Sequence, residues 1–334
     1  MRRALLVGAG GMGVAWARNL LANEGTELAG WIDLDEGKAS QEAQRLEVQN
    51  IHIGSDLESG LDLVQPDFVV DVTSPDAHRA VTLAALSRRI PVLGEKPMAD
   101  SLASAREMVA AATHNETLYM VSQSRRYVTG LAQFREAIRS LGSLGILHVD
   151  FMLGPHFGGF RDAMDHPLLL DMAIHTFDAA RYLSGLDADS VYAEAFNPSW
   201  SWYAGAASAH ALFEMEEGVR FAYRGSWCAE GVPTSWEGSW RAVCSEGSAT
   251  WDGGGRIETR RVIGDSGFFR ELEEVAVSQP TVIEGIAGSL SEFLEALDTG
   301  ATPMGECHDN IKSFAMVFAS IESASVGARV PVSS

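Results

Sequence analysis

The chain has 334 residues, of which 46% are hydrophobic, and its formal net charge at pH 7 is −20. This length predicts two domains, each with its own core, and the acidic balance argues against nucleic acid or an anionic membrane surface as a partner. Three cysteines without paired spacing predict neither a disulfide framework nor a structural zinc site, which favours a reduced cytoplasmic location, and no apolar run is long enough for a membrane helix.

The first predicted strand, residues 4–7, leads directly into the glycine-rich stretch GAGGMG. Its glycines match G-x-G-x-x-G, and the residues that follow are typical of a helix and then a second strand. In such a turn the first glycine permits the tight bend, the second lets a pyrophosphate approach, and the third lets the helix pack on the strand, while free N–H groups at the helix start attract the anion. The stretch therefore supplies the candidate cofactor-binding residues Gly8, Gly10, Gly11, Met12 and Gly13.

Asp33 ends the second predicted strand, at the spacing expected of a ribose-binding carboxylate. A carboxylate there accepts hydrogen bonds from ribose hydroxyls and would repel a 2′-phosphate, and no arginine follows in DLDEG to hold one. The pattern therefore predicts NAD, with NADP less favoured. The alternative interpretation is a glycine-rich turn beside a solvated aspartate, which the surrounding strand and helix pattern argues against.

Strands and helices continue to alternate as far as residue 123, with helices predicted at about 76–89 and 101–113. This pattern predicts a doubly wound α/β domain with a parallel sheet, in which ligands bind beyond the carboxyl ends of the strands. Two polar stretches, TSPDAH at 73–78 and GEKP at 94–97, are expected at those ends. Charged residues after a strand are often solvated, so Lys96 is only a suggestive ligand-facing group on this pattern alone.

The predicted helix LLLDMAIHTFDAARYL, residues 168–183, is apolar except for three groups that would share one stripe: Asp171, His175 and Asp178. We expect Leu170, Ile174 and Phe177 to form its buried side. The polar stripe has three interpretations: a catalytic face, a metal site, or a set of mutually satisfied polar groups. We predict no metal.

From about residue 145 the pattern changes to strands that predict a large, mostly antiparallel sheet. Tryptophan on such a sheet either stacks on a sugar ring or buries a subunit interface, and the interface interpretation is favoured. We therefore predict a homodimer or homotetramer built through this sheet. His156 and Arg161, with edge tryptophans, are candidates for a carbohydrate pocket. The tryptophans of this region are at positions 200, 202, 227, 236, 240 and 251.

The stretches GAGGMG, TSPDAH, GEKPMA and DMAIHTFD, in this order and spacing, resemble the glucose-fructose oxidoreductase / inositol dehydrogenase (Gfo/Idh/MocA) family. The resemblance runs nearly end to end and implies an N-terminal Rossmann domain, residues 1–123, and a C-terminal α/β domain, residues 124–334, with an open sheet and an active site between the two. The last helices, about 284–327, resemble those that pack back toward the Rossmann domain in that family.

Particular residues match the family's functional positions. The matches to its catalytic positions are Lys96, Asp171 and His175. The matches to its cofactor side are Ser74, Pro75, His78, Glu95 and Lys96. Arg126 matches an arginine after the last Rossmann strand, and Asp178 matches a position near substrate. The resemblance makes both of them candidates for substrate binding.

The sequence also departs from the family pattern at three places. Asp165–Pro167 replace a glycine triplet, which makes His166 a further candidate for contact with substrate. Asp76 and Ser124 stand where asparagine is common. We expect these departures to affect which substrate binds, because none of them removes a catalytic group.

The resemblance implies an NAD-dependent dehydrogenase acting on a secondary hydroxyl, or the corresponding ketone, of a sugar, inositol or related polyol. An imidazole with a pKa near 6.5 suits removal of the hydroxyl proton, so His175 is the leading general base, with Asp171 to orient it and Lys96 to stabilise the alkoxide or share the proton. Two alternatives are an NAD-dependent glycoside hydrolase that oxidises its substrate transiently, and a non-catalytic NAD-binding regulator.

Overall fold

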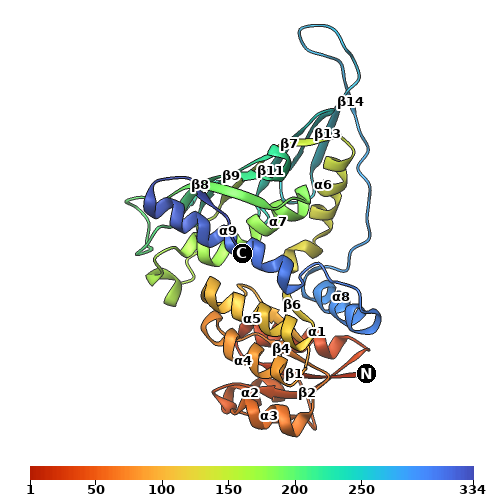
Figure 1. Cartoon of the computed structure of the whole chain (residues 1–334), viewed down its shortest axis with the longest axis vertical. Helices are drawn as coiled ribbons and strands as arrows, with labels where there is room; N and C mark the ends of the chain where they lie inside the picture. The colour runs from red at the N-terminus through yellow and green to blue at the C-terminus, as the bar shows by residue number, and fades with distance from the viewer. The chain divides into compact units, whose positions relative to one another are not determined.

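The computed structural model describes all 334 residues, and the chain divides into two compact units (Figure 1). Unit 1 consists of Met1–Ser124 and Ile283–Ile311, and unit 2 of Arg125–Val282 and Lys312–Ser334. Each unit contains one sheet. None of the helices combines the length and the apolar character that a membrane crossing would require.

Unit 1 is built on a six-stranded parallel sheet in the order β3-β2-β1-β4-β5-β6, the order of a dinucleotide-binding Rossmann fold. Strands β4, β5 and β6 bury every one of their residues, because helices cover both faces of a parallel sheet. The strands are β1 (Arg2–Val7), β2 (Thr26–Ile32), β3 (His52–Gly54), β4 (Phe68–Asp71), β5 (Val92–Glu95) and β6 (Tyr119–Ser122).

Four of the six helices of unit 1 begin at recognisable signals. The side chains of Asp35, Asp56 and Ser101 each accept a hydrogen bond from a first-turn N–H group, and Pro75 occupies the first position of its helix. The helices are α1 (Gly11–Ala22), α2 (Glu36–Arg45), α3 (Leu57–Val64), α4 (Pro75–Ser87), α5 (Leu102–Asn115) and α8 (Gly285–Thr299). The last of these returns to the sheet, where Phe293 packs against Phe68 with ring centroids 5.5 Å apart.

Unit 2 contains a nine-stranded sheet in the order β14-β13-β12-β11-β7-β10-β9-β8-β15. All neighbouring pairs are antiparallel except β7 and β10. The connection between β13 and β14 projects beyond the sheet (Figure 1). The strands are β7 (Leu144–Met152), β8 (Ala188–Phe196), β9 (Ser208–Met215), β10 (Arg220–Ser226), β11 (Ser239–Cys244), β12 (Gly247–Trp251), β13 (Ile257–Val262), β14 (Leu272–Glu274) and β15 (Val330–Pro331).

Helices cover one face of this sheet. Phe177 of α7 makes edge-on contacts with Phe213 and Tyr223, at centroid distances of 4.9 and 5.1 Å, and Phe134 of α6 lies 5.9 Å from Trp251. The α-helices and π-helix are α6 (Thr129–Arg139), a π-helical segment η3 (Leu168–Ala173), α7 (Ile174–Ser184) and α9 (Cys307–Val326), which begins in unit 1. Short 3-10 turns are η1 (Ser124–Tyr127), η2 (Gly159–Ala163) and η4 (Glu216–Gly218).

The predicted fold class is confirmed, since a parallel Rossmann sheet is followed by a mostly antiparallel sheet. The prediction that the tryptophans of this region bury a subunit interface is wrong for Trp227, Trp240 and Trp251, because these side chains are at most 2% exposed within one copy of the chain. They lie on the inner face of the sheet and form its core, for example where Trp240 stacks on Phe221. Sequence alternation could not tell which of the two faces the helices would cover.

Candidate functional site

The glycine-rich turn after β1 is as tight as its sequence predicts. Gly8 has a φ of +108°, and a Cβ atom there would lie 2.7 Å from the Val72 carbonyl oxygen. A Cβ atom on Gly13 would lie 2.1 Å from the Gly8 carbonyl oxygen, which is closer than any side chain tolerates. Both positions therefore require glycine, because β1, β4 and the start of α1 approach one another through their backbones.

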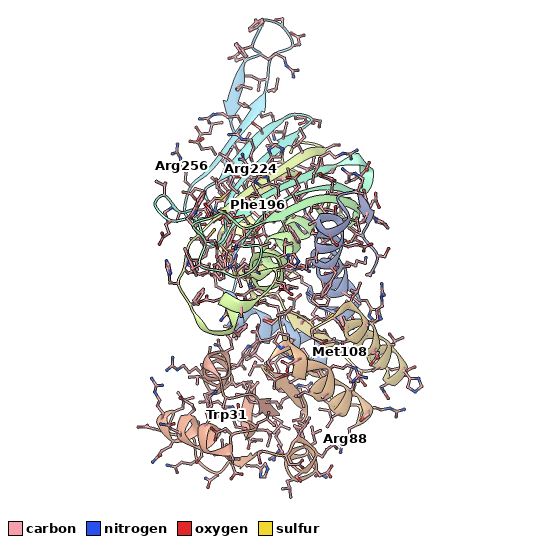
Figure 2. All side chains as sticks on the ribbon, turned by 90° about the vertical axis from the view of Figure 1, so that its left-hand side faces the viewer. Trp31, Arg88, Met108, Phe196, Arg224 and Arg256 are labelled. Atoms are coloured by element: carbon pink, nitrogen blue, oxygen red, sulfur yellow. The ribbon has the colours of Figure 1, made fainter.

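Asp33 is held in place by the turn that it faces. Its Oδ2 accepts a hydrogen bond from the Ala9 N–H at 2.6 Å, and its Oδ1 accepts from the Asp35 N–H at 2.9 Å. The indole of buried Trp31 (Figure 2) donates to the Gly8 carbonyl at 2.9 Å and so fixes β2 against the same turn. The carboxylate thus lies beside the backbone that would receive a pyrophosphate, as ribose binding requires.

A cavity of about 540 Å³ opens at the carboxyl ends of β1, β2 and β4. A Cβ atom at Gly10 or Gly11 would meet nothing within 4 Å, so the backbone there borders open space, and the first N–H groups of α1 face the same turn. These features fit a dinucleotide. The cavity is lined by the predicted Gly8, Gly10, Gly11, Met12, Asp33 and Ser74, and also by Leu34, Lys38, Ser55, Leu57, Thr73 and Ala77.

Four of the cavity residues that the sequence analysis missed follow or lie near strand ends. Ser55 and Leu57 follow β3, and Lys38 lies in the first turn of α2 after β2. The rule that ligands bind beyond strand ends would have found them, had it been applied to these strands as well as to β4 and β5. Leu34 is 95% exposed and offers an apolar surface at the rim of the cavity.

His78, predicted on the cofactor side, is buried rather than exposed in the cavity. Its Nδ1 lies 3.0 Å from Asp71 Oδ2, and the Thr73 hydroxyl donates to the other oxygen of that carboxylate at 2.7 Å. Burial alone would lower the pKa of His78, but the neighbouring Asp71 and Glu95 carboxylates outweigh it, so the pKa is raised. His78 thus supports the loop after β4, which carries Thr73 and Ser74.

Glu95 and Lys96 do not form a solvated loop. Glu95 is the last residue of β5 and is buried, and its Oε1 accepts from the Trp16 indole at 2.8 Å. Its Oε2 accepts from the Lys96 N–H at 3.1 Å. Burial raises the pKa of Glu95, although the Trp16 hydrogen bond and the Lys96 charge oppose this. Glu95 therefore positions the start of the Lys96–Pro97 segment, whose peptide bond is cis.

In unit 2, Asp171 lies in the π-helical segment η3 rather than in a regular α-helix. Single π turns inside helices are rare, and they occur frequently at functional sites. Leu170, expected in the core, is half-buried. Asp171 Oδ2 accepts from Arg161 Nε at 2.6 Å, a partner that sequence spacing did not indicate. His175 follows in α7 and is 7% exposed.

Asp178 and Arg126, both predicted near substrate, are partners of each other. Arg126 Nε donates to Asp178 Oδ2 at 2.8 Å and its Nη2 donates to Oδ1 at 2.7 Å, with both side chains almost fully buried. The Ser313 hydroxyl donates to Oδ1 at 2.7 Å and accepts from Arg181 Nη1 at 2.9 Å. This geometry makes Asp178 part of a buried ionic network that links η1, α7 and α9.

The other predicted substrate residues lie on or near loops of unit 2. His156 is stacked on Trp202 with centroids 3.7 Å apart and forms an exposed pair with Glu230 at 3.0 Å. His166 precedes η3, and burial lowers the pKa of its imidazole, against the opposing charge of Asp165. Arg161 lies over the rings of two exposed residues, Phe157 and Phe160, at 5.2 and 4.8 Å.

A Rossmann unit with an intact dinucleotide turn, joined to a unit with a mostly antiparallel sheet, defines the class of two-domain NAD-binding oxidoreductases. Residues 2–123 match the model of the oxidoreductase family with an NAD-binding Rossmann fold, and residues 139–250 match the Gfo/Idh/MocA C-terminal domain. The chain belongs to the Gfo/Idh/MocA oxidoreductase family, which confirms the predicted resemblance and NAD as its cofactor.

Three relatives illustrate this placement. An uncharacterized protein of Sinorhizobium fredii, y4oX, is 28% identical over 99% of this chain and 95% of its own. The inositol 2-dehydrogenase of Rubrobacter xylanophilus is 33% identical, but over 58% of this chain and 55% of its own. The crystal structure of an oxidoreductase from Agrobacterium radiobacter, in complex with NAD⁺, L-tartaric acid and magnesium, superposes with a TM-score of 0.87 at 21% identity, covering 99% of this chain and 98% of that one.

Proposed function

We propose that the protein is an NAD-dependent dehydrogenase that oxidises a secondary hydroxyl of a sugar, inositol or related polyol, or reduces the corresponding ketone. The bound nicotinamide supplies the hydride acceptor. The chain's own residues remove the hydroxyl proton: His175 acts as general base, and Lys96 stabilises the alkoxide or shares the proton. Asp171 orients His175 or favours its protonated form. The inositol 2-dehydrogenase of Rubrobacter xylanophilus supports this substrate class by its similarity.

The observation that carries the proposal is the environment of Asp171. Its carboxylate is bonded to Arg161, which lies beside the exposed rings of Phe157 and Phe160. A polyol or sugar has hydroxyls that bond to charged groups and C–H faces that pack on aromatic rings, so charged and aromatic groups side by side suit it. A cyclic polyol would satisfy both kinds of group at once.

Assembly through the open face of the unit 2 sheet is a second part of the proposal. That face carries the exposed apolar side chains Ile146, Tyr192, Phe196, Leu212 and Val243, each between 38% and 41% exposed (Phe196 is labelled in Figure 2). Covering such a surface with a second copy is the usual solution in symmetric oligomers. We propose that the protein forms a homodimer or homotetramer in the cytoplasm. Light scattering that reports a monomer at micromolar concentration would contradict this oligomeric state.

The first experiment is an absorbance assay for reduced nicotinamide with purified protein, NAD and a panel of inositols, sugars, sugar acids and glycosides. We expect NADH to accumulate with a free polyol, and both Lys96→Ala and His175→Ala to lower kcat by 100-fold or more, on the order of the usual contribution of general acid–base catalysis. NAD binding, followed by protein fluorescence, should remain in His175→Ala.

Each remaining outcome has a distinct meaning. Cleavage of a glycoside without accumulation of NADH would replace the dehydrogenase by the hydrolase that oxidises transiently. NAD binding without turnover of any compound would favour the regulator. Unchanged kinetics in His175→Ala would remove that residue from the mechanism.

A further inference from the structure

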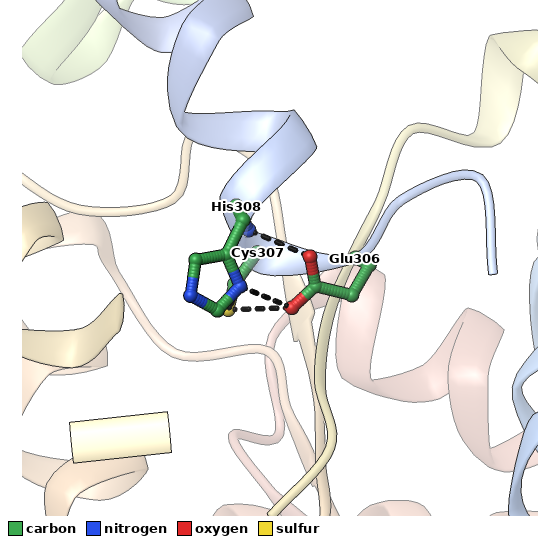
Figure 3. Close-up of side chains that lie close together, drawn as sticks. All are labelled: Glu306, Cys307 and His308. Atoms are coloured by element: carbon green, nitrogen blue, oxygen red, sulfur yellow. Dashed lines mark hydrogen bonds and ion pairs between the residues drawn. The ribbon is translucent and has the colours of Figure 1, made fainter. Parts of the chain in front are cut away.

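Three adjacent residues, Glu306, Cys307 and His308, gather their ligand atoms at one point in unit 1, where α9 begins (Figure 3). Glu306 Oε1 lies 3.0 Å from Cys307 Sγ and 2.8 Å from His308 Nδ1, and Sγ lies 3.5 Å from Nδ1. The NAD site does not use any of the three residues. A carboxylate, a thiol and an imidazole are the three side-chain types that zinc prefers.

The surroundings hold two of these groups in place from outside the trio. His308 Nε2 lies 2.8 Å from the Thr113 hydroxyl, which itself donates to the Val109 carbonyl at 2.9 Å. Because that hydroxyl proton is already used, the hydroxyl accepts from Nε2–H, and Nδ1 is turned toward Glu306. A metal-binding histidine usually donates its second N–H in this way. Glu306 Oε2 accepts from the His308 backbone N–H at 2.9 Å, so Oε1 is left for the cluster.

The backbone before the cluster is anchored to the Rossmann sheet. The Val121 N–H donates to the Gly305 carbonyl at 2.8 Å, and a β-bridge joins Met120 of β6 to Glu306. A Cβ atom on Gly305 would lie 2.3 Å from the Val121 carbonyl oxygen, so only glycine permits this approach. The segment that carries the ligand atoms is therefore held by backbone contacts with β6 and by the contact between His308 and Thr113 of α5.

The distances are close to those of a metal site. Tetrahedral zinc with normal bond lengths places its N, O and S ligand atoms about 3.3–3.6 Å apart. The Sγ–Nδ1 distance already has this value, and the two distances to Oε1 reach it if the carboxylate oxygen moves outward by roughly 0.5 Å. Cys307 is fully buried, whereas His308 is half exposed, so an ion would enter from the histidine side.

We propose that Glu306, Cys307 and His308 form a binding site for one Zn²⁺ ion, with water as the fourth ligand on the exposed side. The ion replaces the thiol proton and the proton between Nδ1 and Oε1, which are released to solvent. A thiolate ligand selects zinc over magnesium or calcium, which prefer oxygen ligands alone. The site ties the first turn of α9 to β6 and α5 and is separate from the proposed reaction.

The test uses the purified protein without NAD, titrated with Co²⁺ as a spectroscopic substitute for zinc. We expect one equivalent to produce a thiolate-to-cobalt charge-transfer band in the near ultraviolet, together with the intense visible bands of tetrahedral cobalt, both abolished by stoichiometric Zn²⁺. Cys307→Ser should lose the charge-transfer band. Cys244→Ser is the matched control and should keep it, because Cys244 lies in β11 of unit 2.

A second variant keeps the proposal testable if Cys307→Ser does not fold. His308→Asn changes a half-exposed side chain and should weaken Co²⁺ binding at least tenfold while leaving circular dichroism unchanged. Zn²⁺ should raise the Tm of the wild type and of Cys244→Ser but not that of His308→Asn. The proposal is overturned if ten equivalents of Co²⁺ give no charge-transfer band in the wild type, or if the band persists in Cys307→Ser.

Discussion

Removal of the Asp178 carboxylate is predicted to destabilise unit 2 strongly, because it leaves the Arg126 guanidinium buried without its partner. The pair makes two charge-assisted hydrogen bonds of 2.7 and 2.8 Å, and its side chains are only 3% and 7% exposed. Breaking a buried pair from one side costs about 3–5 kcal/mol. At roughly 2–4 °C per kcal/mol for a domain of this size, the Tm of Asp178→Ala should fall by about 6–20 °C.

Urea unfolding followed by tryptophan fluorescence measures this loss, and most of the tryptophans lie in unit 2. Asp150→Ala is the matched control, since Asp150 pairs with Arg224 in the same two-bond geometry, at 2.6 and 2.7 Å, but at the surface. That change should cost about 1 kcal/mol or less. The double variant Arg126→Met with Asp178→Leu should recover much of the stability.

The reasoning is refuted if Asp178→Ala unfolds within about 1 kcal/mol of the Asp150→Ala control, because the network would then contribute no more than a surface pair does. A direct substrate role gives a different pattern. In that case a folded Asp178→Asn protein would show a raised KM for substrate, with a free energy of unfolding close to that of the wild type.

Three further predictions follow from unit 1. Asp33→Ala should weaken NAD binding by roughly 10–150-fold, because a charged hydrogen-bond acceptor is lost, and should reduce the preference for NAD over NADP. An equal loss of affinity for both cofactors in fluorescence titrations would contradict this prediction. Gly13→Ala should lower the free energy of unfolding by about 1–3 kcal/mol and abolish NAD binding, because the added Cβ would lie 2.1 Å from the Gly8 carbonyl oxygen. If the variant unfolded at the same urea concentration as the wild type, the contact would not be destabilising. The pKa of His78 is raised in the folded state, so its pairing with Asp71 contributes stability that is fully present below about pH 6.5 and is lost as the pH rises through the folded pKa. His78→Gln should flatten this part of the curve of unfolding free energy against pH. An unchanged slope would show that the pair does not contribute to stability.

Local sequence was enough to predict the Rossmann unit and its cofactor turn. Gly8, Gly13 and Asp33 carry requirements that involve only neighbouring strands and helices: a positive φ, a close backbone approach and a carboxylate at a strand end. Such requirements leave a pattern in residue type and spacing. The parallel sheet with helices on both faces then follows from the alternation of strand and helix.

Tertiary structure decided how the polar side chains are used. Arg126 and Asp178 are 52 positions apart and read as two substrate residues, yet folding pairs them in a buried network with Ser313. Asp171 lies in the π-helical segment η3 and pairs with Arg161, a partner that spacing did not indicate. Three of the tryptophans, Trp227, Trp240 and Trp251, are buried on the covered face of the sheet. These outcomes depend on which side chains become buried and which buried charges must then be paired. Packing between distant segments decides both, and spacing along the chain does not record that packing.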